Sequence, residues 1–344
     1  MRSDRFRTVL AALAALTLLA SACGSDDDAI ESDPTQNDGE PATIVVTTNV
    51  LGDVVEDVVG DQAEVVTIMP VGADPHDFQP SAQEVDALVS ADALIVNGAG
   101  FEEGLLDVIE SARDEGVPTY EAIDAVATIA FGEDSHSEEH GDEEEHADDD
   151  EHTDEEDSED EQGRDHEGAD PHFFTDPMRM AAATDGIVAF LSAEVDGIDA
   201  PALDASADAY VAELDALDTE VTSLVDAVPA ERRVLVTNHE VFGYFADRYG
   251  FEVVGVVIPG GSTTDAASAG ELAELAEVIE AEGVPAIFAD TSSPDELVTT
   301  LADEVGDIEV VELYSESLGE PGSDGATYLG MVQTNAERIS AALA

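Results

Sequence analysis

Residues 232–259 read "RRVLVTNHEVFGYFADRYGFEVVGVVIP", and this stretch decides the fold class. Two runs rich in β-branched residues, 232–238 and 251–259, are typical of strands. The segment between them, 239–250, has the length and pattern of a helix. Two strands joined by such a helix form a right-handed βαβ unit with parallel strands. The stretch therefore predicts an α/β protein built on parallel sheet.

The same alternation of strand and helix occurs in two series along the chain. In the first series, strands are expected at 43–48, 64–69 and 93–100, with helices between them. In the second series, strands at 284–290 and 308–314 follow the opening unit, and the chain closes on a helix. Two series of this kind predict two lobes, each with a parallel sheet flanked by helices.

A long helix is expected between the two series. Apolar residues from Leu203 to Val228 recur at helical spacing, and Pro229 follows them. We therefore divide the chain into an N-terminal lobe (43–177), linking helices (178–229) and a C-terminal lobe (230–344). Ligands of open α/β sheets bind at the carboxyl ends of strands, so a cleft between the lobes is the expected site.

The first 25 residues, "MRSDRFRTVLAALAALTLLASACGS", have the layout of a secretory signal. The apolar run Val9–Ala20 is shorter than the roughly 20 residues that span a bilayer. Cys23 is the one cysteine of the chain, and "LASAC" resembles a bacterial lipobox. We predict a signal peptide (1–22), a lipid-modified Cys23 and a flexible tether (23–42) that holds the protein on the outer face of the cell membrane. The alternative is an ordinary signal with an incidental cysteine.

The chain is strongly acidic. Its formal net charge is −72, and it contains no lysine. This charge excludes nucleic acid as a partner and favours cationic ones, although a salt-adapted proteome would produce a similar composition. With 43% hydrophobic residues, the chain can form two cores of ordinary domain size, and we expect a monomer.

A block of acidic residues and histidines, 132–170, interrupts the first lobe. It shows no apolar periodicity, so we expect it to be disordered. It contributes His136, His140, His146, His152 and His166. These histidines form either a flexible array of weak metal ligands that raises the local concentration of dications, or part of a merely solvated acidic loop.

Three histidines lie outside this block. His76 and His239 follow predicted strands, and His172 stands where the ordered pattern resumes; Glu316 comes just past the last predicted strand. All four are therefore expected to face one cleft. Three imidazoles and one carboxylate complete a tetrahedral shell for Zn²⁺, although a single histidine beside a strand is more often a hydrogen-bonded loop residue. The motif "ADPH" occurs twice and ends once at His76 and once at His172. Its proline restricts the backbone just before each histidine.

Four segments carry a family resemblance: "GADPHDFQPS", "DPHFFTDP", "NHEVFGYFADRYGFEVVGVV" and "LYSESLGEPGSDGATYLGMVQTNAERI". They resemble the zinc-binding substrate-binding proteins of bacterial ABC importers, a group that also includes manganese and iron binders. The resemblance runs from about residue 43 to the end. It implies a rigid connecting helix, zinc held between the lobes by His76, His172, His239 and Glu316, and delivery of zinc to a permease and an ATPase. In zinc-binding members a histidine- and acid-rich loop lies near the mouth of the site.

Two positions of this resemblance bear on the ligands and on the choice of metal. Glu316 stands where the family usually has aspartate, so Glu240 or a water is the alternative fourth ligand. Manganese-binding relatives place a glutamate in the third ligand position, five residues before the tyrosine of "YF". In this chain the tyrosine of "YF" is Tyr244, and the residue five positions before it is His239. The resemblance therefore implies zinc rather than manganese.

Other functions fit the sequence less well. A metallohydrolase is disfavoured because no second histidine lies four residues after His239, and because four protein ligands leave no position for water. We therefore predict that the protein is not an enzyme. A manganese or iron importer subunit, and a cell-surface metal buffer or adhesin without a transporter, stay open as alternatives.

Overall fold

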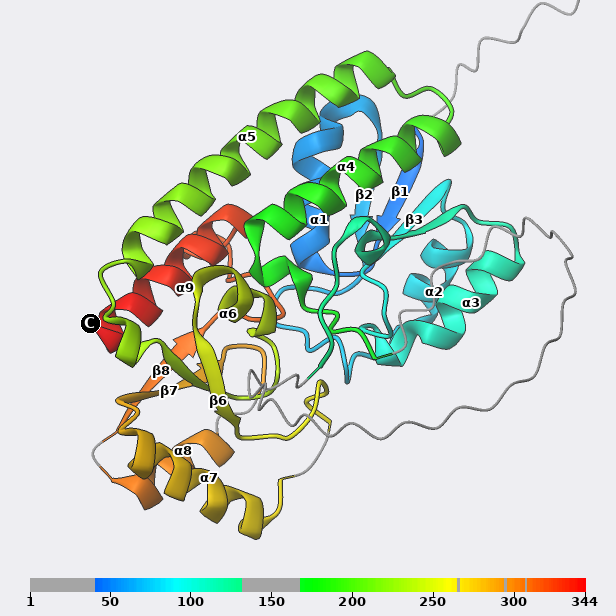
Figure 1. Ribbon diagram of the computed structural model, residues 1–344. Coiled ribbons are helices and arrows are strands. Elements are labelled where there is room, and N and C mark those ends of the chain that lie inside the picture. Colours follow the sequence, from blue (N-terminus) through cyan, green and yellow to red (C-terminus); the bar gives the residue numbers. More distant parts are fainter. Residues whose placement is uncertain (1–40, 132–167, 265–266, 294–295, 307) are drawn as a thin grey trace, which may run out of the picture. The chain divides into compact units, whose positions relative to one another are not determined.

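The computed structural model describes residues 41–131, 168–264, 267–293, 296–306 and 308–344 (Figure 1). Residues Pro41–Ala344 form one compact unit. The predicted signal peptide, Cys23 and nearly all of the tether lie outside the described residues. The same holds for His136, His140, His146, His152 and His166.

The first sheet has four parallel strands in the order β2-β1-β3-β4. Its elements are β1 (Thr43–Val46), α1 (Asn49–Val59), β2 (Glu64–Thr67), α2 (Ala82–Val89), β3 (Ala93–Val96), α3 (Leu106–Asp114) and β4 (Thr119–Glu121). Alternate residues of β1 enter different cores: Ile44 and Val46 pack with α1, whereas Val45 packs with α2 and α3. Both faces of the sheet are therefore covered, as parallel sheets require.

The second sheet repeats this plan in the order β6-β5-β7-β8, again all parallel. Its elements are β5 (Val234–Thr237), α6 (Gly243–Tyr249), β6 (Glu252–Val256), α7 (Ala269–Glu282), β7 (Ala286–Asp290), α8 (Glu296–Val305), β8 (Glu309–Leu313) and α9 (Tyr328–Leu343). The predicted βαβ unit of residues 232–259 is confirmed, with Val234 paired to Glu252. Two parallel sheets, each flanked by helices, confirm the predicted fold class.

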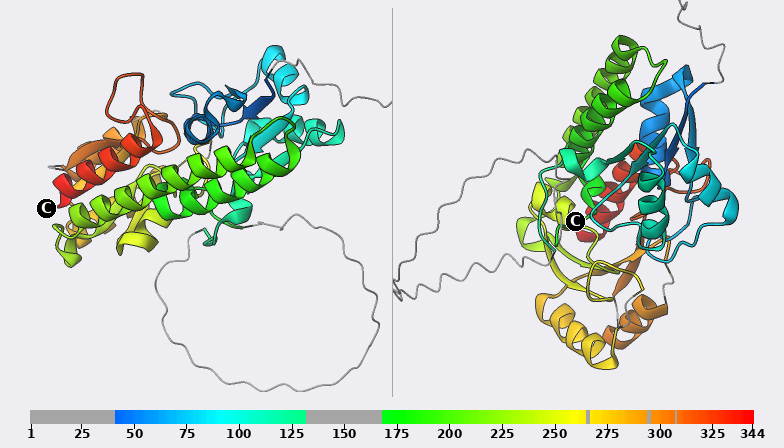
Figure 2. Two further views of the ribbon diagram at one scale, coloured as in Figure 1. Left: turned by 90° about the horizontal axis from the view of Figure 1, so that it is seen from above. Right: turned by 90° about the vertical axis from the view of Figure 1, so that its right-hand side faces the viewer.

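Two helices lie between the sheets in sequence: α4 (Pro177–Glu194) and α5 (Ala200–Val225). They run side by side in the views of Figures 1 and 2. Helix α5 also contacts α1 of the first lobe and α9 of the second. The predicted apolar face of α5 is buried at Leu203, Ala207, Tyr210, Leu214, Leu217, Val221 and Val225. The helix ends at Val225 rather than at Val228, which is buried in the following turn.

One hydrophobic core cluster extends through both lobes. It includes Ile44 from β1, Leu235 from β5, Leu214 from α5 and Tyr328 from α9. Two smaller clusters lie under α2 and α3, and under α7 and α8. The lobes therefore share apolar packing as well as chain connections.

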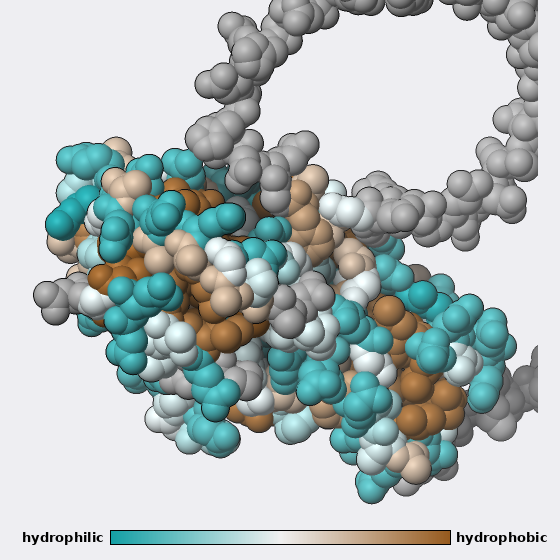
Figure 3. All heavy atoms as spheres, turned by 90° about the horizontal axis from the view of Figure 1, so that it is seen from below, coloured by the Kyte–Doolittle hydropathy of each residue, from teal (hydrophilic) through white to brown (hydrophobic). Residues whose placement is uncertain are grey.

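Few large hydrophobic residues of the described segments are strongly exposed. Those most exposed among the described residues are Leu106, Val278 and Val310. On the face seen in Figure 3, hydrophobic patches are separated by hydrophilic residues. No helix of the described segments combines the length and the apolar character needed to cross a bilayer.

The end of the acidic block differs from the prediction. We expected disorder through residue 170, but Ala169 forms an antiparallel bridge with Ala130, and the Asp170 N–H donates to Ile129 O at 2.9 Å. Asp170 is only 3% exposed. The prediction is wrong for residues 168–170 because Asp170 has hydrogen-bond partners inside the protein, which acidic composition alone does not reveal.

Candidate metal centre

His76, His172, His239 and Glu316 form one buried cluster, and their potential ligand atoms all lie within 4.8 Å of one another. None of the four is more than 5% exposed. His76 lies between β2 and α2, His172 just before α4, His239 two residues after β5, and Glu316 three residues after β8. Both lobes therefore contribute to the cluster, as the positions after the predicted strands indicated.

One carboxylate oxygen is the centre of this cluster. Glu316 Oε1 lies 2.7 Å from His76 Nε2, 3.1 Å from His239 Nε2 and 3.3 Å from His172 Nε2. The second oxygen, Oε2, is buried and has no hydrogen-bond partner among the described residues. Three imidazole nitrogens and a carboxylate thus point to one position, and this donor set suits a borderline-soft dication.

The two "ADPH" segments share one local hydrogen bond. Asp74 Oδ1 accepts the His76 N–H at 2.9 Å, and Asp170 Oδ1 accepts the His172 N–H at 2.9 Å. An aspartate carboxylate that accepts the N–H two residues ahead fixes the local backbone. The repeated motif therefore places both histidines by the same local interaction, to which the aspartate contributes as well as the proline.

Carboxylates also orient two of the imidazole rings. His172 Nδ1 lies 2.7 Å from Asp170 Oδ1, and His76 Nδ1 lies 3.0 Å from Glu103 Oε1. A carboxylate on Nδ1 fixes the ring so that Nε2 faces the metal. His239 Nδ1 is buried and has no such partner among the described residues.

Sequence reasoning missed both orienting carboxylates. Asp170 could have been found, because it belongs to the repeated "ADPH". Glu103 carried no signal, because it lies 27 residues from His76 along the chain.

Aromatic rings enclose the histidines. Phe101 makes edge contacts with His76 and His172, at ring-centroid distances of 5.4 Å and 5.5 Å. Phe174 and Phe131 approach His172 at 5.9 Å and 6.1 Å. These rings exclude water from the cluster, and electrostatic interactions inside it are therefore stronger than at the surface.

The pKa values of the cluster show how its charges interact. Burial is the largest influence on His76 and His172 and lowers the pKa of each. For His76, the hydrogen bond and charge of Glu316 outweigh burial and raise the pKa above its ordinary value. For His172, Asp170 and then Glu316 raise the pKa to about 9. Burial raises the pKa of Glu316, but the charge of His239 and the hydrogen bonds of the three histidines lower it well below its usual range.

Glu240, the alternative fourth ligand, lies next to His239 in the sequence. His239 lies in the cluster, and Glu240 is not one of its four members. Glu240 instead lines a cavity beside β6 and α6, which Asp170 also lines. Its N–H donates to Gly260 O at 3.3 Å. Of these two neighbours, His239 is the one in the cluster, and its role as a metal ligand stays a prediction.

A buried cluster of histidine and carboxylate donors, supplied by two parallel-sheet lobes, defines the class of metal-binding substrate-binding proteins. Residues 44–342 match the family described as "Zinc-uptake complex component A periplasmic" (ZnuA), and the chain belongs to this family. Its members are substrate-binding components of ABC importers, so the prediction that the protein is not an enzyme is confirmed.

Individual relatives cover the whole chain. The zinc-binding protein TroA of Treponema pallidum is 31% identical over 100% of both chains. The manganese-binding lipoprotein MntA of Bacillus subtilis is 26% identical, also over 100% of both. The solved structure of the T. pallidum periplasmic zinc-binding protein TroA superposes with a TM-score of 0.73 at 30% identity, and covers 89% of this chain and 100% of that one.

Proposed function

We propose that this protein captures zinc outside the cytoplasm and delivers it to the permease and ATPase of an ABC importer. The ligands are His76, His172, His239 and Glu316. The observation that carries the proposal is the convergence of three imidazole Nε2 atoms on one oxygen of Glu316, at 2.7–3.3 Å, in a buried site. Membership of the metal-importer family supports the transport role.

The choice of zinc rests on the donor set. Imidazole nitrogen suits zinc, whereas carboxylate, carbonyl and water oxygens suit manganese. Relatives of both kinds exist, since TroA is named for zinc and MntA for manganese. The histidine at position 239 therefore supports the zinc assignment, because it keeps the imidazole count at three.

Competition binding tests this assignment. Stripped of metal, the chain from residue 24 onward should bind one zinc tightly and manganese far more weakly in calorimetric titrations. His239→Glu is the matched variant, since it exchanges one imidazole for a carboxylate and should narrow the difference between the metals. Equal affinity of the parent for zinc and manganese would overturn the zinc assignment. Tight zinc binding without any effect of gene loss on zinc uptake would favour a metal buffer or adhesin.

We also propose that Cys23 carries the lipid anchor on the outer face of the membrane. The lipobox-like "LASAC" supports this, and the relatives named as lipoproteins are consistent with it. Cys23→Ser should prevent incorporation of labelled fatty acid and release the protein from the membrane fraction. Unchanged labelling would contradict the anchor.

A further inference from the structure

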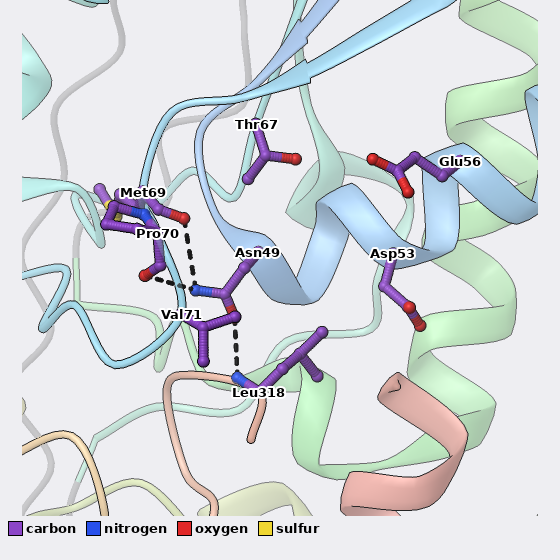
Figure 4. A pocket seen from close by; sticks show the side chains of 8 residues that line it. All are labelled: Asn49, Asp53, Glu56, Thr67, Met69, Pro70, Val71 and Leu318. Carbon is purple, nitrogen blue, oxygen red and sulfur yellow. Dashed lines mark hydrogen bonds between the residues drawn. The ribbon is translucent and has the colours of Figure 1, made fainter. Parts of the chain in front are cut away.

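Asn49, the first residue of α1, lies between two loops of the candidate metal centre. Its Nδ2 donates to Pro70 O at 3.2 Å and to Met69 O at 3.4 Å. Its Oδ1 accepts the Leu318 N–H at 2.7 Å and the Ser317 hydroxyl at 3.3 Å. Figure 4 shows the amide directed at Met69 and Pro70 on one side and at Leu318 on the other. One side chain therefore bonds to segments 248 residues apart along the chain.

A second hydrogen bond joins the same two loops directly. The Gly72 N–H donates to Ser317 Oγ at 2.7 Å. Gly72 lies four residues before His76 in the N-terminal lobe, and Ser317 directly follows Glu316 in the C-terminal lobe. The loop that carries Glu316 is therefore attached to the loop that carries His76 at two places.

The Glu316 loop has fewer such contacts on its other side. Ser315 Oγ and Glu316 Oε2 are buried and have no hydrogen-bond partner among the described residues. One residue earlier, at Tyr314, the backbone N–H donates to Asn335 Oδ1 at 2.9 Å. Between Ser315 and Leu318, the side-chain hydrogen bonds to other parts of the chain, apart from those of the histidines, involve Asn49 and Gly72. Within the loop itself, the Ser317 hydroxyl also lies 3.2 Å from Leu318 O.

We propose that Asn49 is a positioning residue that joins the His76 loop to the Glu316 loop, so that ligands from different lobes hold one metal ion at a fixed separation. This role rests on the proposed metal site. The amide is suited to it because asparagine supplies both donors and an acceptor, and here it uses both. Aspartate has nearly the same shape but cannot donate to Met69 O and Pro70 O.

The surroundings of Asn49 separate this role from a contribution to folding. Asn49 lines a cavity of about 280 Å³, together with Asp53, Thr67, Val71 and others. If the amide is removed, the backbone groups that it served lie beside this cavity, where water can reach them. We therefore expect the main effect on the metal site and a small effect on the metal-free fold.

The experiment compares Asn49→Ala, Asn49→Asp and Ser317→Ala with the parent chain, using zinc competition against a chelator and the visible spectrum of bound Co²⁺. Removing groups that support metal ligands typically costs about 10- to 100-fold in affinity. We expect a loss in this range for Asn49→Ala and Asn49→Asp, mainly through faster zinc dissociation. The Co²⁺ spectrum should move toward that of Glu316→Gln, because the carboxylate is displaced.

Asn335→Ala is the matched control. Asn335 is also buried, and its amide also bonds on both sides to backbone, but both bonds are made to Tyr314 within one lobe. An equal loss of zinc affinity in this variant would mean that any loosening near Glu316 suffices, and would overturn the role of Asn49 between the loops. Parent-like affinity and spectrum in Asn49→Ala would overturn it too.

Further variants separate failure of the Asn49 role from failure to fold and from failure of the proposed metal site. If Asn49→Ala does not fold, Asn49→Asp decides, because it keeps the shape of the side chain and its acceptor oxygen and removes only the donation to Met69 O and Pro70 O. If Glu316→Ala and His76→Ala bind zinc as the parent does, the proposed ligand set is wrong, and the role of Asn49 falls with it. If those variants lose zinc while both Asn49 variants and Ser317→Ala do not, only the positioning role is wrong.

Discussion

At the scale of single residues, carboxylates lie beside the Nδ1 atoms of two imidazoles of the proposed zinc site. The side chain of Asp170 is 4% exposed and that of Glu103 is 39% exposed. A buried charge contact is screened less than an exposed one. We therefore expect Asp170→Asn to weaken zinc binding by about 10- to 100-fold and Glu103→Gln to weaken it less. Chelator competition measures both. A larger loss for Glu103→Gln than for Asp170→Asn would show that burial of the carboxylate does not set the size of its effect.

Removal of the ligands themselves should cost more. His76→Ala, His172→Ala and His239→Ala each delete one donor from a closed shell, and each should weaken zinc binding by more than the roughly 100-fold upper range for supporting groups. Substitution of the five histidines between His136 and His166 should leave the tight site unchanged, and serves as the control. Parent-like affinity in any one of the three alanine variants would remove that residue from the ligand set.

Zinc binding should also depend on pH over a wide range. A protonated imidazole cannot bind metal, and the pKa of His172 is raised to about 9 in the metal-free protein. Zinc affinity should therefore fall from about pH 9 downward, not only below the ordinary histidine pKa of about 6.5. Titration in buffers of different ionisation enthalpy should detect the released protons. An affinity independent of pH between 9 and 6 would contradict this.

The stability of the metal-free protein should decrease as pH rises, whereas its zinc affinity should increase. A histidine whose folded pKa lies above its unfolded value stabilises the fold below the unfolded pKa. That contribution is lost as pH rises through the folded pKa, so for His172 the window is about pH 6.5 to 9. Denaturant unfolding of the metal-free parent should show this decrease, and His172→Gln should reduce it. A parent that becomes more stable across the window would contradict the assignment.

At the scale of elements, the acidic block can be tested by deletion. The Phe131 N–H donates to Gly168 O at 3.4 Å, so the residues that flank 132–167 lie together. Replacing residues 133–167 by a short glycine-serine linker should therefore leave the proposed tight zinc site intact, since changes in the length of a connecting segment cost little closure entropy. Weak additional zinc sites should be lost, in the deletion and in a variant that lacks only the five histidines. Loss of the tight site would place part of the block in the primary shell.

The order and type of the elements could largely be predicted from sequence, but their ends could not. The helix predicted from His239 begins at Gly243, because the Thr237 hydroxyl and the Val241 N–H both donate to His239 O and hold a loop there. The first strand ends at Val46 rather than at residue 48, because Thr47 donates to Glu102 and Thr48 caps α1. Most of these contacts are local turn and capping hydrogen bonds, and one joins residues 55 apart along the chain, so hydrophobic periodicity reveals none of them.

At the scale of the whole molecule, acidic charge is balanced by very few cations. Six arginines lie in the described segments, and each donates to a carboxylate or a backbone carbonyl: Arg113, Arg179, Arg232, Arg233, Arg248 and Arg338. Surface pairs of this kind contribute about 0–1 kcal/mol each. Repulsion among the acidic groups acts over the whole surface and is screened by salt.

The melting temperature should therefore rise as sodium chloride increases from about 0.1 M to 1 M, over which the screening length shortens from about 10 Å to 3 Å. Sucrose at equal osmolality is the control, since it does not screen charge. A melting temperature that falls with salt would show that the arginine pairs outweigh the repulsion.

The core that extends through both lobes limits how this protein can release its cargo. Separating the lobes widely would expose part of that core to water at about 25 cal/mol per Å². Exposure of about 400 Å² would then cost about 10 kcal/mol, which is comparable to the whole stability of a typical domain. In mechanical terms, the two lobes are expected to behave as one rigid body rather than to open about a hinge. We expect a transporter to free the ion by displacing one ligand loop while the relative position of the lobes stays the same.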